Sequence, residues 1–142
     1  MDEKIAVTLT NLQCNGFDAR FAENLDIASK LILEIIPVNV RVGVADSATI
    51  RQVGVLDDLQ RRGTNIVNPF LKELTVGRGK LPALEEMLRE TLGTNTFLTG
   101  ANAITQNGRI VSIDRVGNRV AGMIFGAKKV IVVVGRNKIV RD

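Results

Sequence analysis

Histidine, tryptophan and tyrosine are absent from this 142-residue sequence, and cysteine occurs once, at Cys14. Without histidine there is no imidazole for acid–base catalysis, for a Ser-His triad, or for most zinc and haem sites. One cysteine can form neither an internal disulfide nor a four-thiolate iron–sulfur cluster, and it fits a reducing, cytoplasmic setting. With five phenylalanines as its only aromatic residues, the chain offers little for stacking nucleic-acid bases. The composition therefore identifies no cofactor and no resident metal.

Long apolar runs are also lacking. No stretch reaches the ~18 residues that a membrane-spanning helix needs. Residues 1–4 are not a basic n-region followed by an apolar h-region, so we expect no signal peptide. Apolar residues make up 45% of the chain and charged residues 24%, which are ordinary values for a globular protein. The length fits one domain, and no internal repeat or linker divides it. We expect a single domain over residues 1–142, with no membrane contact.

Hydrophobic periodicity predicts helices and strands that alternate along the chain. Asn24 is a suitable N-cap for an apolar-striped helix that Pro37 would end, and Pro82 and Gly93 bracket another. The dipeptide Asn107-Gly108 is the strongest hairpin signal. The expected helices cover residues 1–15, 25–36, 48–61, 82–92 and 118–125, and the expected strands cover residues 18–22, 38–45, 64–67, 96–99, 103–105, 109–113, 130–134 and 137–140.

Alternating strands and helices imply an α/β fold with a mostly parallel sheet that is flanked by helices. The hairpin at Asn107-Gly108 would add one antiparallel element. Residues 130–134 form a continuous β-branched run, typical of a strand that is buried on both faces. Residues 137–140 are expected to extend the same sheet.

The candidate binding segments follow two of the expected strands, because open α/β sheets bind ligands outside the carboxyl ends of their strands. The first segment, residues 43–49, leads from a strand into a helix and carries the hydroxyls of Ser47 and Thr49. Asp46 or Ser47 could equally serve only as the helix cap.

The second segment, within residues 99–119, is richer in polar side chains. Glycines permit close backbone approach, asparagines both donate and accept hydrogen bonds, and an arginine is a fork-shaped donor to carboxylate or phosphate. Asp114 is the candidate for an acid–base or nucleophilic role, with a salt bridge to Arg115 or Arg119 as the alternative. The predicted ligand-binding residues of this segment are Gly100, Asn102, Gly117, Asn118 and Arg119.

Charge is unevenly distributed. Residues 109–142 carry eight basic and two acidic residues, whereas residues 1–108 carry eleven basic and thirteen acidic ones. A basic C-terminal third suggests an anionic ligand or an acidic partner, or else a solvated surface. Nucleic acid is disfavoured because no recognition motif accompanies the charge. Residues 77–80 (GRGK) look like a phosphate-binding loop but lack the spacing and Ser/Thr of a P-loop.

Three stretches resemble the LUD (lactate-utilisation) domain family: residues 97–108 (FLTGANAITQNG), 113–121 (IDRVGNRVA) and 128–140 (KKVIVVVGRNKIV). A weaker match begins at Val42-Gly43, although relatives usually have glycines where Ala45 and Asp46 stand. The resemblance implies a NagB/RpiA/CoA-transferase-like fold, shared by ribose-5-phosphate isomerase, glucosamine-6-phosphate deaminase and CoA-transferases. In that superfamily the site lies in loops at the strand ends, and ligands are commonly phosphorylated or CoA-linked.

The same resemblance implies a role in lactate or organic-acid utilisation, because some family members belong to systems that oxidise lactate beside iron–sulfur proteins. The leading hypothesis is a domain that binds a small anionic metabolite. The alternative is a non-catalytic subunit that docks an iron–sulfur protein through its basic C-terminal third. Longer relatives continue into a C-terminal helix and a cysteine-containing tail, and a homodimer could cover the apolar surface that such a segment would bury.

Overall fold

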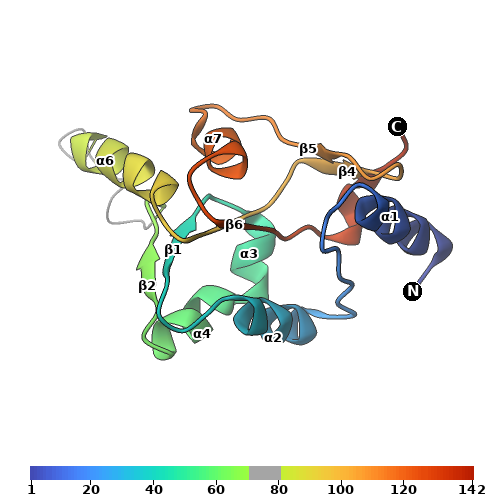
Figure 1. Ribbon diagram of the computed structural model, residues 1–142, viewed down its shortest axis with the longest axis horizontal. Coiled ribbons are helices and arrows are strands. Elements are labelled where there is room, and N and C mark those ends of the chain that lie inside the picture. Colours follow the sequence, from blue (N-terminus) through green and yellow to red (C-terminus); the bar gives the residue numbers. More distant parts are fainter. Residues whose placement is uncertain (71–80) are drawn as a thin grey trace.

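A parallel four-stranded sheet forms the centre of the protein in the computed structural model, which describes residues 1–70 and 81–142 (Figure 1). Its strands are β1 (Arg41–Val44), β2 (Asn65–Val67), β3 (Thr96–Thr99) and β6 (Lys129–Val132), in the order β2-β1-β3-β6. Every neighbouring pair is parallel, as predicted. The GRGK sequence at residues 77–80, which resembles a phosphate-binding loop only in composition, lies outside the described residues.

Helices cover both faces of this sheet (Figure 1). α2 (Leu25–Ile35), α3 (Ala48–Val53) and α4 (Val55–Arg61) lie on one face, and α6 (Leu81–Leu92) and α7 (Asn118–Ile124) lie on the other. The main core fills the space between the sheet and the first group of helices. It consists of Ile32, Ile36, Val42, Val44, Ile50, Val53, Val55, Leu59, Leu98 and Ile131.

A second, smaller sheet is built around the predicted hairpin. β4 (Ala103–Thr105) pairs antiparallel with β5 (Ile110–Val111) across the Asn107-Gly108 turn, and parallel with β7 (Ile139–Val140). α1 (Glu3–Cys14) docks on this turn: the amide of Asn11 donates to the carbonyl of Gln106 at 2.8 Å, and that of Asn15 donates to the carbonyl of Gly108 at 2.9 Å. The N-terminal helix is thus attached to the second sheet.

Local capping explains where the helices begin. The side chain of Asn24 accepts a hydrogen bond from the N–H of Ile27, as its predicted N-cap role requires. The helix predicted over residues 48–61 is instead two helices. Gly54 adopts a left-handed conformation (φ 73°) that ends α3, and α4 begins at the next residue.

Three predicted strands differ from the structure. Residues 18–22 form no strand: Asp18 and Arg20 pair with each other, and Phe21 stays exposed. The prediction that the apolar run from residue 130 is buried on both faces is wrong, because β6 is an edge strand in which only Ile131 is buried. The segment at residues 137–140 does not extend the main sheet; its β7 pairs with β4 in the second sheet.

None of the helices within residues 1–70 and 81–142 combines the length and the apolar character that crossing a membrane requires.

Candidate functional site

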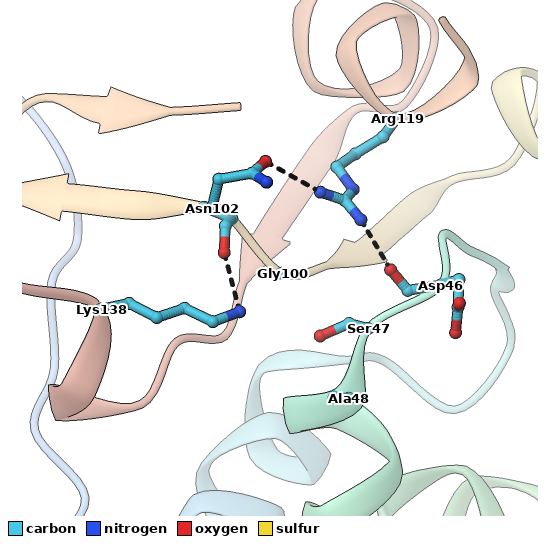
Figure 2. A pocket seen from close by; sticks show the side chains of 8 residues that line it. Asp46, Ser47, Ala48, Gly100, Asn102, Arg119 and Lys138 are labelled. Atoms are coloured by element: carbon cyan, nitrogen blue, oxygen red, sulfur yellow. Dashed lines mark hydrogen bonds between the residues drawn. The ribbon is translucent and has the colours of Figure 1, made fainter. Parts of the chain in front are cut away.

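An open pocket of about 250 Å³ lies at the carboxyl ends of β1 and β3 (Figure 2). This is the edge of the sheet where an α/β fold is expected to bind its ligand. The pocket brings together parts of α3, the β3–β4 connection, α7 and the 3₁₀ helix η2 (Arg136–Lys138). It is lined by Asp46, Ser47, Ala48, Gly100, Ala101, Asn102, Arg119 and Lys138.

Arg119 reaches into this pocket from the first turn of α7 and is held at both ends of its guanidinium (Figure 2). Its Nη1 donates to Oδ1 of Asn102 at 3.2 Å, and its Nη2 donates to the backbone carbonyl of Asp46 at 2.9 Å. Oδ1 of Asn102 also accepts from the N–H of Ile113 at 2.8 Å, which fixes the amide. Asn102 therefore acts as a positioning residue for the arginine.

Lys138 supplies a second cation from the opposite side of the pocket (Figure 2). Its Nζ donates to the carbonyl of Ala101 at 2.9 Å. Sequence reasoning missed Lys138, because residues 137–140 were interpreted as a strand of the main sheet. The signal that could have found it is the basic excess of residues 109–142, joined to the expectation that anions bind at this edge.

Ser47 and Gly100 meet at the base of the pocket. Oγ of Ser47 is the N-cap of α3 and accepts from the N–H of Ile50 at 3.4 Å, which leaves the hydroxyl hydrogen free to be donated. A Cβ at Gly100 would lie 2.4 Å from that Oγ. Glycine is therefore required here for the end of β3 to approach the start of α3.

Hydrogen-bond donors outnumber free acceptors in the pocket. A guanidinium has five N–H bonds and an ammonium has three. Among the described residues Arg119 uses two of its five and Lys138 uses one of its three, and the buried Nε of Arg119 has no partner. The acceptors beside them, Oδ1 of Asn102 and the carbonyls of Asp46 and Ala101, are already occupied by these two cations. The remaining donors suit a ligand that is rich in acceptors.

The negative charge of Asp46 does not cancel this surplus. Figure 2 shows its carboxylate turned away from Arg119, and this carboxylate pairs with the guanidinium of Arg51 on α3. Only the backbone carbonyl of Asp46 faces Arg119. Arg119 and Lys138 form no ion pair with any acidic residue that the structure describes.

Four predicted site residues, Ser47, Gly100, Asn102 and Arg119, line the pocket, and the other four do not. Thr49 is half-buried in the first turn of α3, whereas Gly117 and Asn118 begin α7. Asp114 stands just before α7. Its predicted catalytic role stays a prediction.

The carboxylate of Asp114 binds the backbone at the start of α7. Its Oδ2 accepts from the N–H of Arg119 at 2.6 Å and from the N–H of Val120 at 3.1 Å. Burial alone would raise the pKa of Asp114, but these and neighbouring backbone N–H groups outweigh it and hold the pKa below its ordinary value. The alternative salt bridge to an arginine side chain is not formed within the described residues. Asp114 thus anchors the turn from which the Arg119 side chain leaves.

Among residues 1–70 and 81–142, no group of three or more Cys, Asp or Glu side chains is placed to hold a metal ion. The chemistry of this pocket is that of hydrogen-bond donors and cations.

Comparison with known proteins agrees with the fold and with the resemblance. A sequence model of the LUD domain matches residues 5–142, so the chain belongs to the LUD domain family. At the level of its family, it is a protein related to lactate utilisation. Curated proteins give no significant match.

A solved structure shows the same fold. Ribose 5 phosphate isomerase A from Neisseria gonorrhoeae is similar to this chain with a TM-score of 0.50 and 17% sequence identity. The alignment covers 82% of this chain and 53% of that chain, so the present chain spans about half the length of that protein. The expected NagB/RpiA-like fold is confirmed.

Proposed function

We propose that this LUD domain binds a small anionic metabolite of organic-acid metabolism, through a carboxylate or phosphate group held between Arg119 and Lys138. The observation that carries the proposal is the surplus of donors in the pocket. Two cations have already occupied the neighbouring acceptors and still keep four N–H bonds on their terminal nitrogens, counted over the described residues, beside the buried Nε–H of Arg119.

The size of the pocket supports a small ligand. Pockets for drug-sized ligands commonly range from about 300 to 1,000 Å³, and this one measures about 250 Å³. The family name points to a hydroxy acid such as lactate. The fold relative is by its name an isomerase of ribose 5-phosphate, so a phosphorylated compound is the second class to test.

Each lining side chain has a distinct role in this proposal. Arg119 presents a planar fork that matches the two oxygens of a carboxylate or phosphate. Lys138 adds a point charge, and Ser47 donates its hydroxyl hydrogen. Asn102 holds the guanidinium in place. A proton-transfer role for Asp114 is a separate prediction, to be tested with a bound ligand.

A thermal-shift panel tests the proposal. The purified protein is heated with lactate, pyruvate, other hydroxy acids, ribose 5-phosphate, CoA esters and inorganic phosphate. A ligand present at 100 times its Kd adds about 2.7 kcal/mol to the free energy of unfolding, which corresponds to a rise of roughly 5–13 °C in Tm for a domain of this size. Neutral analogues of the same size serve as controls. If no anion in the panel raises Tm above its neutral analogue, the proposal is wrong.

One observation favours the alternative of a docking subunit. Arg109, Arg115, Lys128, Arg136 and Arg141 are all exposed, and none of them forms an ion pair within the described residues. Such a surface suits an acidic partner, for which the family suggests an iron–sulfur protein. Pull-down of an acidic iron–sulfur protein at low salt, lost at high salt, would support this role. The same capture at high salt would contradict an electrostatic interface.

A further inference from the structure

Asp46 lines the pocket and has two acceptor groups, which bind two different arginines. Its backbone carbonyl accepts from Nη2 of Arg119 at 2.9 Å. Its carboxylate, one methylene away on the same Cα, turns in the other direction (Figure 2). This carboxylate pairs with Arg51. A rotation about the Cα–Cβ bond would therefore bring an anionic side chain toward the guanidinium that is proposed to bind the ligand.

We propose that Arg51 is a positioning residue that keeps the carboxylate of Asp46 off Arg119, and that without Arg51 this carboxylate competes with the ligand as an internal anion. The inference rests on the proposed function and deepens it. According to this inference, the Asp46–Arg51 pair controls whether the anion site is open.

The competition is strong because it is intramolecular. A carboxylate attached beside its target acts at an effective concentration of roughly millimolar or above, and carboxylate–guanidinium pairing can be bidentate and charge-assisted. An external metabolite at a similar concentration would then share the site with Asp46. Arg51 removes the competitor by giving its carboxylate another guanidinium.

The ion pair itself contributes little to folding. The side chains of Arg51 and Asp46 are 60% and 49% exposed, and ion pairs of this kind are weak because water and salt screen them. Variants of either residue should stay folded. The pair Arg61–Asp58 offers a matched control. Arg61 is also an exposed arginine on a short helix, and it pairs within that helix at 2.7 Å. It precedes the amino end of β2, whereas the pocket lies at the carboxyl ends of the strands.

Isothermal titration with inorganic phosphate and with lactate tests the inference on four proteins. We expect Arg51→Ala to raise Kd about fivefold or more. A single unit charge about 4 Å from a bound anion changes Kd about fivefold even at the dielectric constant of water. The double variant Asp46→Asn/Arg51→Ala should recover toward the wild-type Kd because the competitor has lost its charge. Arg61→Ala should bind as the wild type does. The inference is overturned if Arg51→Ala leaves Kd unchanged, or if the double variant stays as weak as Arg51→Ala.

A readout without ligand separates this inference from the proposed function. The NMR signal of the Arg119 Nε–H group, identified by its loss in Arg119→Lys, should shift in Arg51→Ala and return in the double variant. This pattern supports the competing carboxylate even if the wild type binds neither probe, in which case the proposed function fails alone. An Nε–H signal that is the same in all three proteins overturns the inference, whatever the titrations show.

Discussion

Replacing Asp114 by alanine should destabilise the protein through the start of α7. The change removes the carboxylate that accepts hydrogen bonds from the backbone N–H groups of Arg119 and Val120. It also removes a longer hydrogen bond, at 3.3 Å, from the N–H of Val116. These bonds resemble those of an N-cap, whose loss to alanine costs about 0.5–2 kcal/mol. For a domain of this size we expect Tm to fall by roughly 2–9 °C at pH 7. Asp114→Asn should lose less, since asparagine caps nearly as well as aspartate.

The pH dependence of the same effect follows from the sign of the pKa shift. The pKa of Asp114 is lowered on folding from its ordinary value of 3.8. Its stabilising contribution is therefore fully present above that value and is lost as the pH falls through the lower folded value.

The assay is urea denaturation at pH 7 and at several values below 4. The difference between wild type and Asp114→Ala should narrow as the pH falls, whereas an exposed-carboxylate control, Glu23→Ala, should match the wild type at pH 7. If Asp114→Ala is as stable as the wild type at pH 7, the anchoring role is refuted, and the case for a catalytic Asp114 is strengthened.

Three further changes test the packing and the pocket. Gly122→Ala should lower the free energy of unfolding by about 1–2 kcal/mol in urea denaturation, because its Cβ would lie 2.4 Å from the buried ring of Phe97 and overpacking outweighs the gain in helix propensity. Gly100→Ala should displace Oγ of Ser47, costing about 1 kcal/mol of helix capping and weakening anion binding in a titration; unchanged affinity would count against the close approach. Lys138→Met should raise the Kd of an anion with little change in Tm, and an equal affinity would remove Lys138 from the site.

Local signals predicted much of this fold because they act over a few residues. The N-cap role of Asn24 and the hairpin turn at Asn107-Gly108 each follow from the preferences of a few neighbouring residues, and both are formed in the structure. Gly54 was harder to predict, because a glycine within a helical pattern can either continue the helix or end it, and the packing of both segments on the sheet decides.

Sheet membership could not be derived in the same way. The run around Ile131 and the short β7 at Ile139–Val140 both favour strands, but the sequence does not say which edge each strand joins. That choice depends on contacts between distant segments, such as the pairing of β7 with β4. The prediction that β6 is buried on both faces was wrong because burial depends on the place of the strand in the sheet, which the local sequence does not specify.

The candidate site was predicted in part, and the missing part has a geometric cause. Ser47, Gly100, Asn102 and Arg119 were chosen because they follow strand ends, and the structure brings all four to one pocket. Lys138 lies in a 3₁₀ helix that reaches the pocket only through the path of the chain after β6. The position of Lys138 in the pocket therefore depends on the course of the chain after β6, which the local sequence does not specify.

The most direct test of the anion site is an isothermal titration of the wild type, Arg119→Ala and Arg115→Ala with the anion that gives the largest thermal shift. Arg115 is a matched control, because it is an exposed arginine just before α7, close to Arg119 in the sequence, and it does not line the pocket. Loss of a charge-assisted hydrogen-bond donor costs about 1.5–3 kcal/mol, so Arg119→Ala should raise Kd by roughly 10- to 150-fold, while Arg115→Ala should bind as the wild type does. Equal affinities in the wild type and Arg119→Ala, or equal losses in both variants, would contradict the assignment of this pocket as the anion site.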